Sequence, residues 1–176
     1  MSLLNIPTLQ SAAGETKEIF EEVQRTIGMI PNGIRLWSAS PDALKIQWNG
    51  IKAGFTKQPE SIKLAAIIRY LMSNENDCTY CTGFNAGMLM NMHGMSQDEL
   101  LAMKSDPSKA PLDERHKALL LFAIKAVRNA DAVNAEDIEA LKKLSISEEE
   151  IFEIVKSASH MFVVNTLFKT FKVEQD

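Results

Sequence analysis

The two cysteines of this chain, Cys78 and Cys81, are separated by only two residues. On a helix, this spacing places both thiols on one face, about one turn apart, with Cα atoms ~5 Å from each other. A disulfide tolerates that separation, so the pair can close and reopen with little movement of the backbone. The amides and the dipole at a helix start also favour a thiolate. The spacing therefore predicts a reactive, redox-cycling dithiol.

The segments around the cysteines predict two helices joined by a polar turn. Asp77 is a suitable N-cap for a helix over 78–92, which Gly94 ends. A preceding helix over 59–72 has an apolar face for a core, with Arg69 on its solvent-facing side. Residues 73–76 are all polar and predict a loop between the two helices. We expect this loop to lead directly into the helix that carries the dithiol.

The rest of the chain predicts an all-α fold. Apolar residues recur at helical spacing, and no stretch alternates with a period of two for long enough to indicate a sheet. We expect a single domain over residues 1–176, with an extended N-terminal arm over 1–15, core helices over 59–101 and C-terminal helices over 113–172. Two capping boxes, which start at Ser96 and Ser147, indicate a faint internal duplication whose second copy has no cysteines.

The composition is that of an ordinary soluble globular protein, because 45% of the 176 residues are hydrophobic and 24% are charged. A formal net charge of −4 gives no basic field for nucleic acid or an anionic membrane. The first ten residues lack the pattern of a secretory signal, and no stretch approaches the ~18 apolar residues of a membrane span. We therefore expect a cytoplasmic protein with no nucleic-acid or membrane partner.

In a reducing compartment, a close pair of cysteines is more typical of catalysis or metal binding than of a structural staple. Zinc would need two further ligands, and the sequence has neither a second CxxC nor a paired-histidine motif. A Cys78–Cys81 disulfide also closes too short a loop to stabilise the fold by much. We expect redox chemistry of the thiols themselves, with no metal and no cofactor.

Several motifs in order along the chain carry a resemblance to a known family. They are Gly28-Met29-Ile30-Pro31-Asn32, Ser40-Pro41, Ser73-x-x-Asn76-x-Cys78-x-Tyr80-Cys81 and Phe162-Val163-Val164-Asn165. In these motifs the chain resembles the carboxymuconolactone decarboxylase family, on its AhpD-like alkylhydroperoxidase branch of peroxidase-related proteins. The resemblance implies an AhpD-like helical bundle, assembled into homo-trimers or hexamers, that reduces a hydroperoxide substrate. It also implies a thiol or lipoyl-type protein as the reductant that reopens the disulfide.

The resemblance implies that Cys81 attacks the peroxide and that Cys78 resolves it as a disulfide. The dipole argument alone favours Cys78 as the thiolate, so both assignments stay open. Active members of the family also have a glutamate and a histidine that relay a proton, and Ala66 and Asn85 stand at those positions here. Asn85 can hydrogen-bond a sulfur, but its amide cannot accept a proton at neutral pH. Loss of such a relay typically costs ~10²–10⁴-fold in rate, so we expect a weak peroxidase or a substitute base.

Three further residues are candidate supporting groups beside Asn85. Glu75 lies three residues before Cys78, close enough for a substitute acid or base, although a surface carboxylate is the plainer interpretation. Tyr80 could donate its hydroxyl to a peroxide or a thiolate, or its ring could line the pocket or pack in a subunit contact. His160 could reach the site from the last helix, or it is a satisfied core histidine.

These observations together predict a dithiol/disulfide oxidoreductase, an antioxidant alkylhydroperoxidase-like enzyme that uses Cys78 and Cys81. Two alternatives stay open. A non-catalytic, oligomeric helical scaffold would keep the cysteines buried and inert. A carboxymuconolactone decarboxylase-like enzyme is the other alternative, although that branch of the family does not rely on a CxxC pair.

Overall fold

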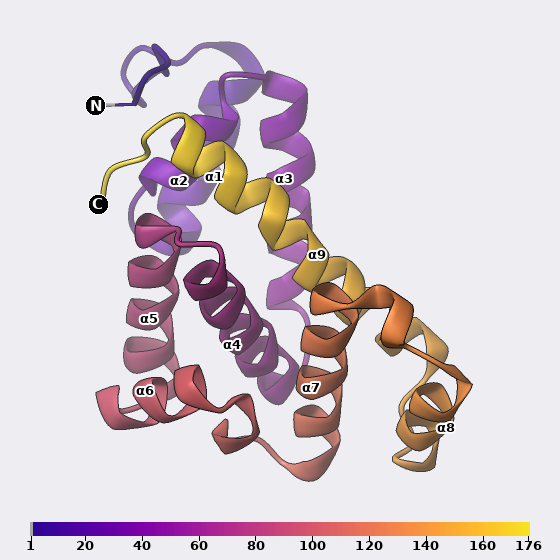
Figure 1. Ribbon diagram of the computed structural model, residues 1–176. Coiled ribbons are helices and arrows are strands. Elements are labelled where there is room, and N and C mark those ends of the chain that lie inside the picture. The colour runs from indigo at the N-terminus through magenta and orange to yellow at the C-terminus, as the bar shows by residue number, and fades with distance from the viewer. Residues whose placement is uncertain (1) are drawn as a thin grey trace. The chain divides into compact units, whose positions relative to one another are not determined.

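The computed structural model describes residues 2–176, and helices are the regular elements throughout these residues (Figure 1). The prediction of an all-α fold is therefore confirmed. The contacts of the chain gather in two compact units. One unit contains the chain up to Lys57 together with Leu167–Asp176, and the other contains Gln58–Thr166. The single domain over 1–176 and the internal duplication stay predictions.

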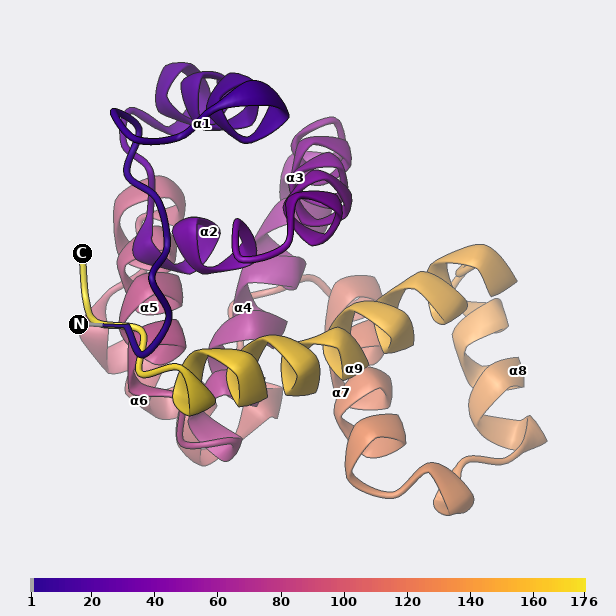
Figure 2. The same cartoon turned by 90° about the horizontal axis from the view of Figure 1, so that it is seen from above.

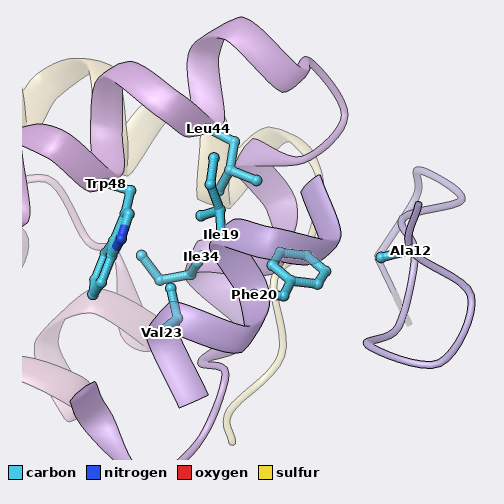
Figure 3. Close-up of a cluster of buried hydrophobic side chains, with 7 residues drawn as sticks. All are labelled: Ala12, Ile19, Phe20, Val23, Ile34, Leu44 and Trp48. Atoms are coloured by element: carbon cyan, nitrogen blue, oxygen red, sulfur yellow. The ribbon is translucent and has the colours of Figure 1, made fainter. Parts of the chain in front are cut away.

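The first unit is built on three helices that share an apolar cluster. α1 (Gly14–Ile27) ends at Gly28, which takes a left-handed conformation with a φ of 88°. α2 (Asn32–Trp37) is short, and α3 (Pro41–Phe55) begins after Ser40, whose side chain caps the helix. The buried side chains of the cluster are Ala12, Ile19, Phe20, Val23, Ile34, Leu44 and Trp48 (Figure 3). Burial of each large apolar side chain contributes about 1.5–3 kcal/mol, which holds the helices of this unit together.

The two ends of the chain meet within the first unit. The backbone N–H of Leu3 donates to the carbonyl of Phe171 at 2.9 Å, and the Asp176 carboxylate accepts the backbone N–H of Asn32 at 2.6 Å. Gly14 already belongs to α1, so the last two residues of the predicted arm over 1–15 are helical. Met1 lies outside the described residues.

The second unit carries both cysteines. Its helices are α4 (Pro59–Glu75), α5 (Thr79–His93), α6 (Gln97–Ser105), α7 (Glu114–Arg128), α8 (Ala135–Lys143) and α9 (Glu148–Thr170), with short 3-10 turns at Pro107–Lys109 and Ala130–Ala132. The last residues of α9 belong to the first unit. α4 packs against α5 on one side and α7 on the other, and α8 follows beyond α7 (Figures 1 and 2). None of the helices in residues 2–176 is both long and apolar enough to span a membrane.

α4 is the central helix of the second unit. Its buried residues are Leu64, Ala66, Ile67, Ile68, Tyr70, Leu71, Met72 and Ser73. Because neighbours cover α4 on most of its circumference, it is a rigid support for whatever packs along it. α5 lies along this support, and the dithiol sits where the chain turns from the end of α4 into α5.

Candidate functional site: a disulfide at the start of α5

The two cysteines form a disulfide at the N-terminus of α5, with Cα atoms 5.3 Å apart. This separation matches the ~5 Å expected for helical spacing. Cys78 is the N-cap of α5, and its Sγ accepts the backbone N–H of Cys81 at 3.4 Å. The predicted N-cap, Asp77, is wrong by one residue, because Asp77 has a φ of 52° and forms the turn that precedes the cap. The helix start therefore directs a backbone donor at a sulfur.

The turn before the disulfide is shorter than the sequence predicted. Ser73, Asn74 and Glu75 form the last turn of α4 rather than a loop. The hydroxyl of Ser73 donates to the Arg69 carbonyl at 2.6 Å, and the amide of Asn74 donates to the carbonyl four residues earlier at 2.9 Å. These polar side chains donate hydrogen bonds to backbone carbonyls of their own helix, so a polar segment can still be helical. The Ser73 carbonyl in turn accepts the backbone N–H of Cys78 at 2.9 Å, which fixes the first cysteine to the end of α4.

Arg69 lies at the site, whereas the sequence placed it on a solvent-facing surface. Its side chain is only partly exposed, and its Nε donates to Asn85 Oδ1 at 3.1 Å. The amide of Asn85 donates to the Cys81 carbonyl at 2.7 Å. Arg69 is the single charged residue between Leu64 and Asn74, and this isolated charge in an apolar helix is the signal that could have identified it. The structure therefore joins an arginine, an asparagine and the second cysteine.

The dithiol is enclosed. Cys78 is 2% exposed, Cys81 is 3% exposed and Asn85 is 5% exposed. Ala66 is fully buried one turn before Arg69 on α4, and its methyl group offers no proton acceptor. The two positions that would hold a proton relay in the resembled family are thus occupied by a methyl group and by an amide that bonds to a cation. Among residues 2–176, no three His, Cys, Asp or Glu side chains gather closely enough to hold a metal ion.

A buried asparagine on α9 also contacts the end of α4. Asn165 is 1% exposed, its Oδ1 lies 3.4 Å from the Ser73 hydroxyl, and its Nδ2 donates to the Met72 carbonyl at 3.4 Å. Buried amides are normally hydrogen-bonded, and Asn165 meets this need by tying α9 to the turn that precedes the disulfide. The sequence motif at 162–165 included this residue without giving it a role. A polar residue inside an apolar helical run was the available signal.

The other candidate supporting residues lie in different surroundings. The Glu75 carboxylate forms an ion pair with Arg128 of α7. Tyr80 is buried, and its ring stacks on Phe84 with centroids 6.0 Å apart. His160 is exposed on α9, and partial desolvation lowers its pKa. Asn85 is thus the candidate supporting residue that the structure shows bonded to one of the two cysteines, through the Cys81 carbonyl.

The sequence matches no protein-family model, and no curated protein matches it. Solved structures do match its fold. An uncharacterized peroxidase-related protein from Ralstonia eutropha JMP134, described as an alkylhydroperoxidase AhpD core, is 21% identical with a TM-score of 0.83 over 99% of this chain and 92% of that one. An uncharacterized peroxidase-related protein from Silicibacter sp. TM1040 is 21% identical with a TM-score of 0.77 over 99% of this chain and 92% of that one.

A third similar structure is a cysteine-to-alanine variant of the debrominase Bmp8 in complex with 2,3,4-tribromopyrrole. It is 19% identical, with a TM-score of 0.72 over 100% of this chain and 94% of that one. At these identities the likeness concerns the arrangement of the helices, and it extends over nearly the whole of each chain. The chain therefore has the fold of the AhpD-like, peroxidase-related proteins.

Proposed function

We propose that this protein is a dithiol/disulfide oxidoreductase that reduces hydroperoxides through Cys78 and Cys81. The observation that carries the proposal is the disulfide at the start of α5, in which the Cys78 sulfur accepts the Cys81 amide. A sulfur at a helix N-terminus is favoured as a thiolate, and the thiolate is the nucleophile in peroxide reduction. The fold shared with peroxidase-related proteins supports the same reaction.

The two cysteines would reduce one hydroperoxide in two steps, and a reductant would then regenerate them. The thiolate of one cysteine attacks the outer oxygen of ROOH, the O–O bond breaks, and the alkoxide takes a proton to leave as ROH. The attacking cysteine becomes a sulfenic acid. The thiol of the other cysteine attacks that sulfur, water leaves, and the Cys78–Cys81 disulfide forms. A dithiol reductant then returns two electrons and two protons to the pair by thiol–disulfide exchange.

The family resemblance and the N-cap geometry favour different cysteines as the attacking residue. The family resemblance implies Cys81 as the attacking residue and Cys78 as the resolving residue. The N-cap geometry stabilises negative charge at Cys78. We retain Cys81 as the attacking cysteine, because Asn85 connects it to a positive charge on Arg69. Trapping the sulfenic acid with dimedone in Cys78→Ser and in Cys81→Ser separates the roles, since only the variant that keeps the attacking cysteine is labelled.

The proposal includes the partners that the resemblance implies. A thiol or lipoyl-type protein is the reductant, the protein works as a homo-oligomer in the cytoplasm, and an organic or inorganic hydroperoxide is the substrate. Because one protein of similar fold is a debrominase, a brominated pyrrole is a second oxidant to offer the reduced dithiol. Bromide release from the pyrrole at a rate above that of peroxide reduction would change the assignment of the substrate.

The burial of the cysteines favours one alternative, an inert pair in a structural scaffold. Alkylation separates the alternatives directly. In the enzyme, the dithiothreitol-reduced native protein reacts with iodoacetamide at neutral pH within minutes, because the thiolate is accessible through local motion. In the scaffold, both thiols resist alkylation until denaturant unfolds the protein. Reaction only after unfolding would therefore refute the proposed function.

A further inference from the structure

The guanidinium of Arg69 is an enclosed positive charge without a carboxylate partner in the described residues. Its side chain donates to the Asn85 amide oxygen at 3.1 Å, and no ion pair within residues 2–176 includes it. Burial lowers the pKa of Arg69 to about 10, so the side chain remains charged at neutral pH. An enclosed charge is costly unless an anion compensates it. The site therefore favours the formation of a negative charge close to Arg69.

Hydrogen bonds along α4 and α5 connect Arg69 to Cys81 through Asn85. The backbone N–H of Cys78 donates to the Ser73 carbonyl at 2.9 Å, and the Ser73 hydroxyl donates to the Arg69 carbonyl at 2.6 Å. Arg69 therefore lies one helical turn before Ser73 on α4, at the level of the first turns of α5. From there it reaches Asn85, whose amide donates to the Cys81 carbonyl at 2.7 Å. A single side chain links the guanidinium to the second cysteine.

The other charged groups around the dithiol are paired or exposed. α5 itself, Thr79–His93, contains no Asp, Glu, Lys or Arg. The carboxylate of Glu75 at the end of α4 is paired with Arg128 of α7, and Asp77 in the turn is exposed. On α9, His160 is exposed, and partial desolvation lowers its pKa. Among these groups, Arg69 is thus the unpaired charge that Asn85 connects to the backbone of Cys81.

The charge of Arg69 also acts along α5. Desolvation is the main cause of the lowered pKa of His93, and the positive charges of Lys63 and Arg69 contribute to it. His93 ends α5, beyond Asn85 and far from the dithiol. The same positive charge favours an anion that forms at a comparable distance from Arg69.

From this arrangement, and on the basis of the function proposed above, we propose that Arg69 is a positioning residue that stabilises the thiolate of Cys81 in the reduced protein. Reduction of the disulfide yields two thiols, and the Cys81 proton leaves to water when the thiolate forms. An opposite charge nearby favours the charged form of an acid, so no side chain needs to accept that proton. Electrostatic stabilisation by Arg69 thus takes the place of general-base activation at Ala66 and Asn85.

The test is a titration of Cys81 alone, in the Cys78→Ser background, by ultraviolet absorbance of the thiolate against pH. In this parent we expect the thiol to titrate below ~8.5, the ordinary value for cysteine. Arg69→Gln should make the thiol about tenfold weaker as an acid, and Arg69→Lys should recover most of that loss because it restores the charge. The matched control is Lys63→Met, which removes another cation of α4 and should change the acidity less than threefold.

Alkylation provides a second measurement, which would not change if Arg69 had only a structural role. In the parent, Arg69 attracts an anionic reagent, so the rate ratio of iodoacetate to iodoacetamide should fall severalfold in Arg69→Gln and recover in Arg69→Lys. If Arg69→Gln fails to fold, Arg69→Met is titrated in its place and Arg69→Lys is compared directly with the parent. Identical titration curves for the parent and a charge-removing variant overturn the proposal, as does a parent thiol that titrates at or above ~8.5.

Failure of this inference can be told from failure of the proposed function. If the wild-type protein consumes no hydroperoxide while the acidity of Cys81 still depends on the charge at position 69, the peroxidase function fails and the inference stands. If hydroperoxide is consumed through both cysteines while that acidity does not depend on Arg69, the function stands and the inference fails.

Discussion

Replacement of Asn85 by alanine tests the buried polar contact between α4 and α5. Asn85 is 5% exposed and accepts the Arg69 Nε–H at 3.1 Å. Its amide also donates to the Cys81 carbonyl at 2.7 Å, but that carbonyl has a second partner in the helix and loses little. A hydrogen bond to a charged donor is worth about 1.5–3 kcal/mol, and the donor left without an acceptor stays enclosed. We therefore expect Asn85→Ala to lower the free energy of unfolding by about 2–3 kcal/mol.

The assay is guanidinium unfolding of the oxidised protein at neutral pH, followed by circular dichroism. A loss of this size corresponds to a fall in Tm of about 5–10 °C for a chain of this length. The matched control is Asn74→Ala, because Asn74 donates to the carbonyl four residues earlier at 2.9 Å and the structure gives it no charged partner. We expect this control to lose about 0.5 kcal/mol. The difference between the two variants measures what the Arg69 contact contributes.

Asn85→Asp completes the comparison, since it keeps the acceptor oxygen and adds a charge opposite Arg69. A carboxylate beside a guanidinium has a folded-state pKa below its unfolded value of ~3.9. Its stabilisation is therefore present above pH ~4 and is lost as the pH falls through the lowered pKa. An Asn85→Ala variant as stable as wild type, or one no less stable than Asn74→Ala, would refute the view that Asn85 supports the partly buried cation of Arg69.

Two further predictions concern the carboxylate of Glu150 and the two positions, 66 and 85, at which the resembled family has a proton relay. The Arg115 guanidinium and the Ser147 donors lower the pKa of Glu150 to about 2, so its stabilisation is present above pH ~4.5 and is lost as the pH falls towards 2. Because Glu150 is partly exposed, Glu150→Gln should lower the free energy of unfolding by only about 1 kcal/mol, measured by urea unfolding at pH 7. If the variant is destabilised equally at pH 2, the predicted direction of the pH dependence is wrong. The double variant Ala66→Glu with Asn85→His should raise the rate of hydroperoxide consumption, because it restores a base. It should also lower the Tm, since Ala66 is fully buried, and an unchanged rate would show that these positions do not form a relay.

Local patterns in the sequence were sufficient for the helical fold and for several helix starts. The capping box at Ser96 forms with Glu99, and the Ser147 side chain and backbone bond to Glu150 in the same way. These contacts join residues three apart, so the sequence alone contains both partners. The two errors next to the dithiol are also local. Polarity indicated a loop at Ser73 and a cap at Asp77, but serine and asparagine side chains also bond to helical carbonyls, and a sulfur can cap a helix.

The contacts between helices around the disulfide were not predictable in this way. Arg69 and Asn85 lie on different helices, and their contact depends on how α4 packs against α5. Helical periodicity assigned Arg69 to solvent because a charged residue normally occupies the exposed face. Asn165 likewise bonds to the end of α4 from a distant part of the chain. The sequence identified the pair of cysteines, whereas the surrounding charge required the structure.

The proposed function requires Cys78 and Cys81 to reduce hydroperoxides together. The most direct measurement mixes the reduced protein with one equivalent of tert-butyl hydroperoxide and follows free thiols, the intramolecular disulfide and tert-butanol over time. We expect each peroxide to consume two thiols and to yield one disulfide and one alcohol, with no catalytic turnover in either Cys78→Ser or Cys81→Ser. Peroxide consumption that proceeds unchanged in one of these variants, or thiols that persist in wild type beside intact peroxide, would contradict the proposed function.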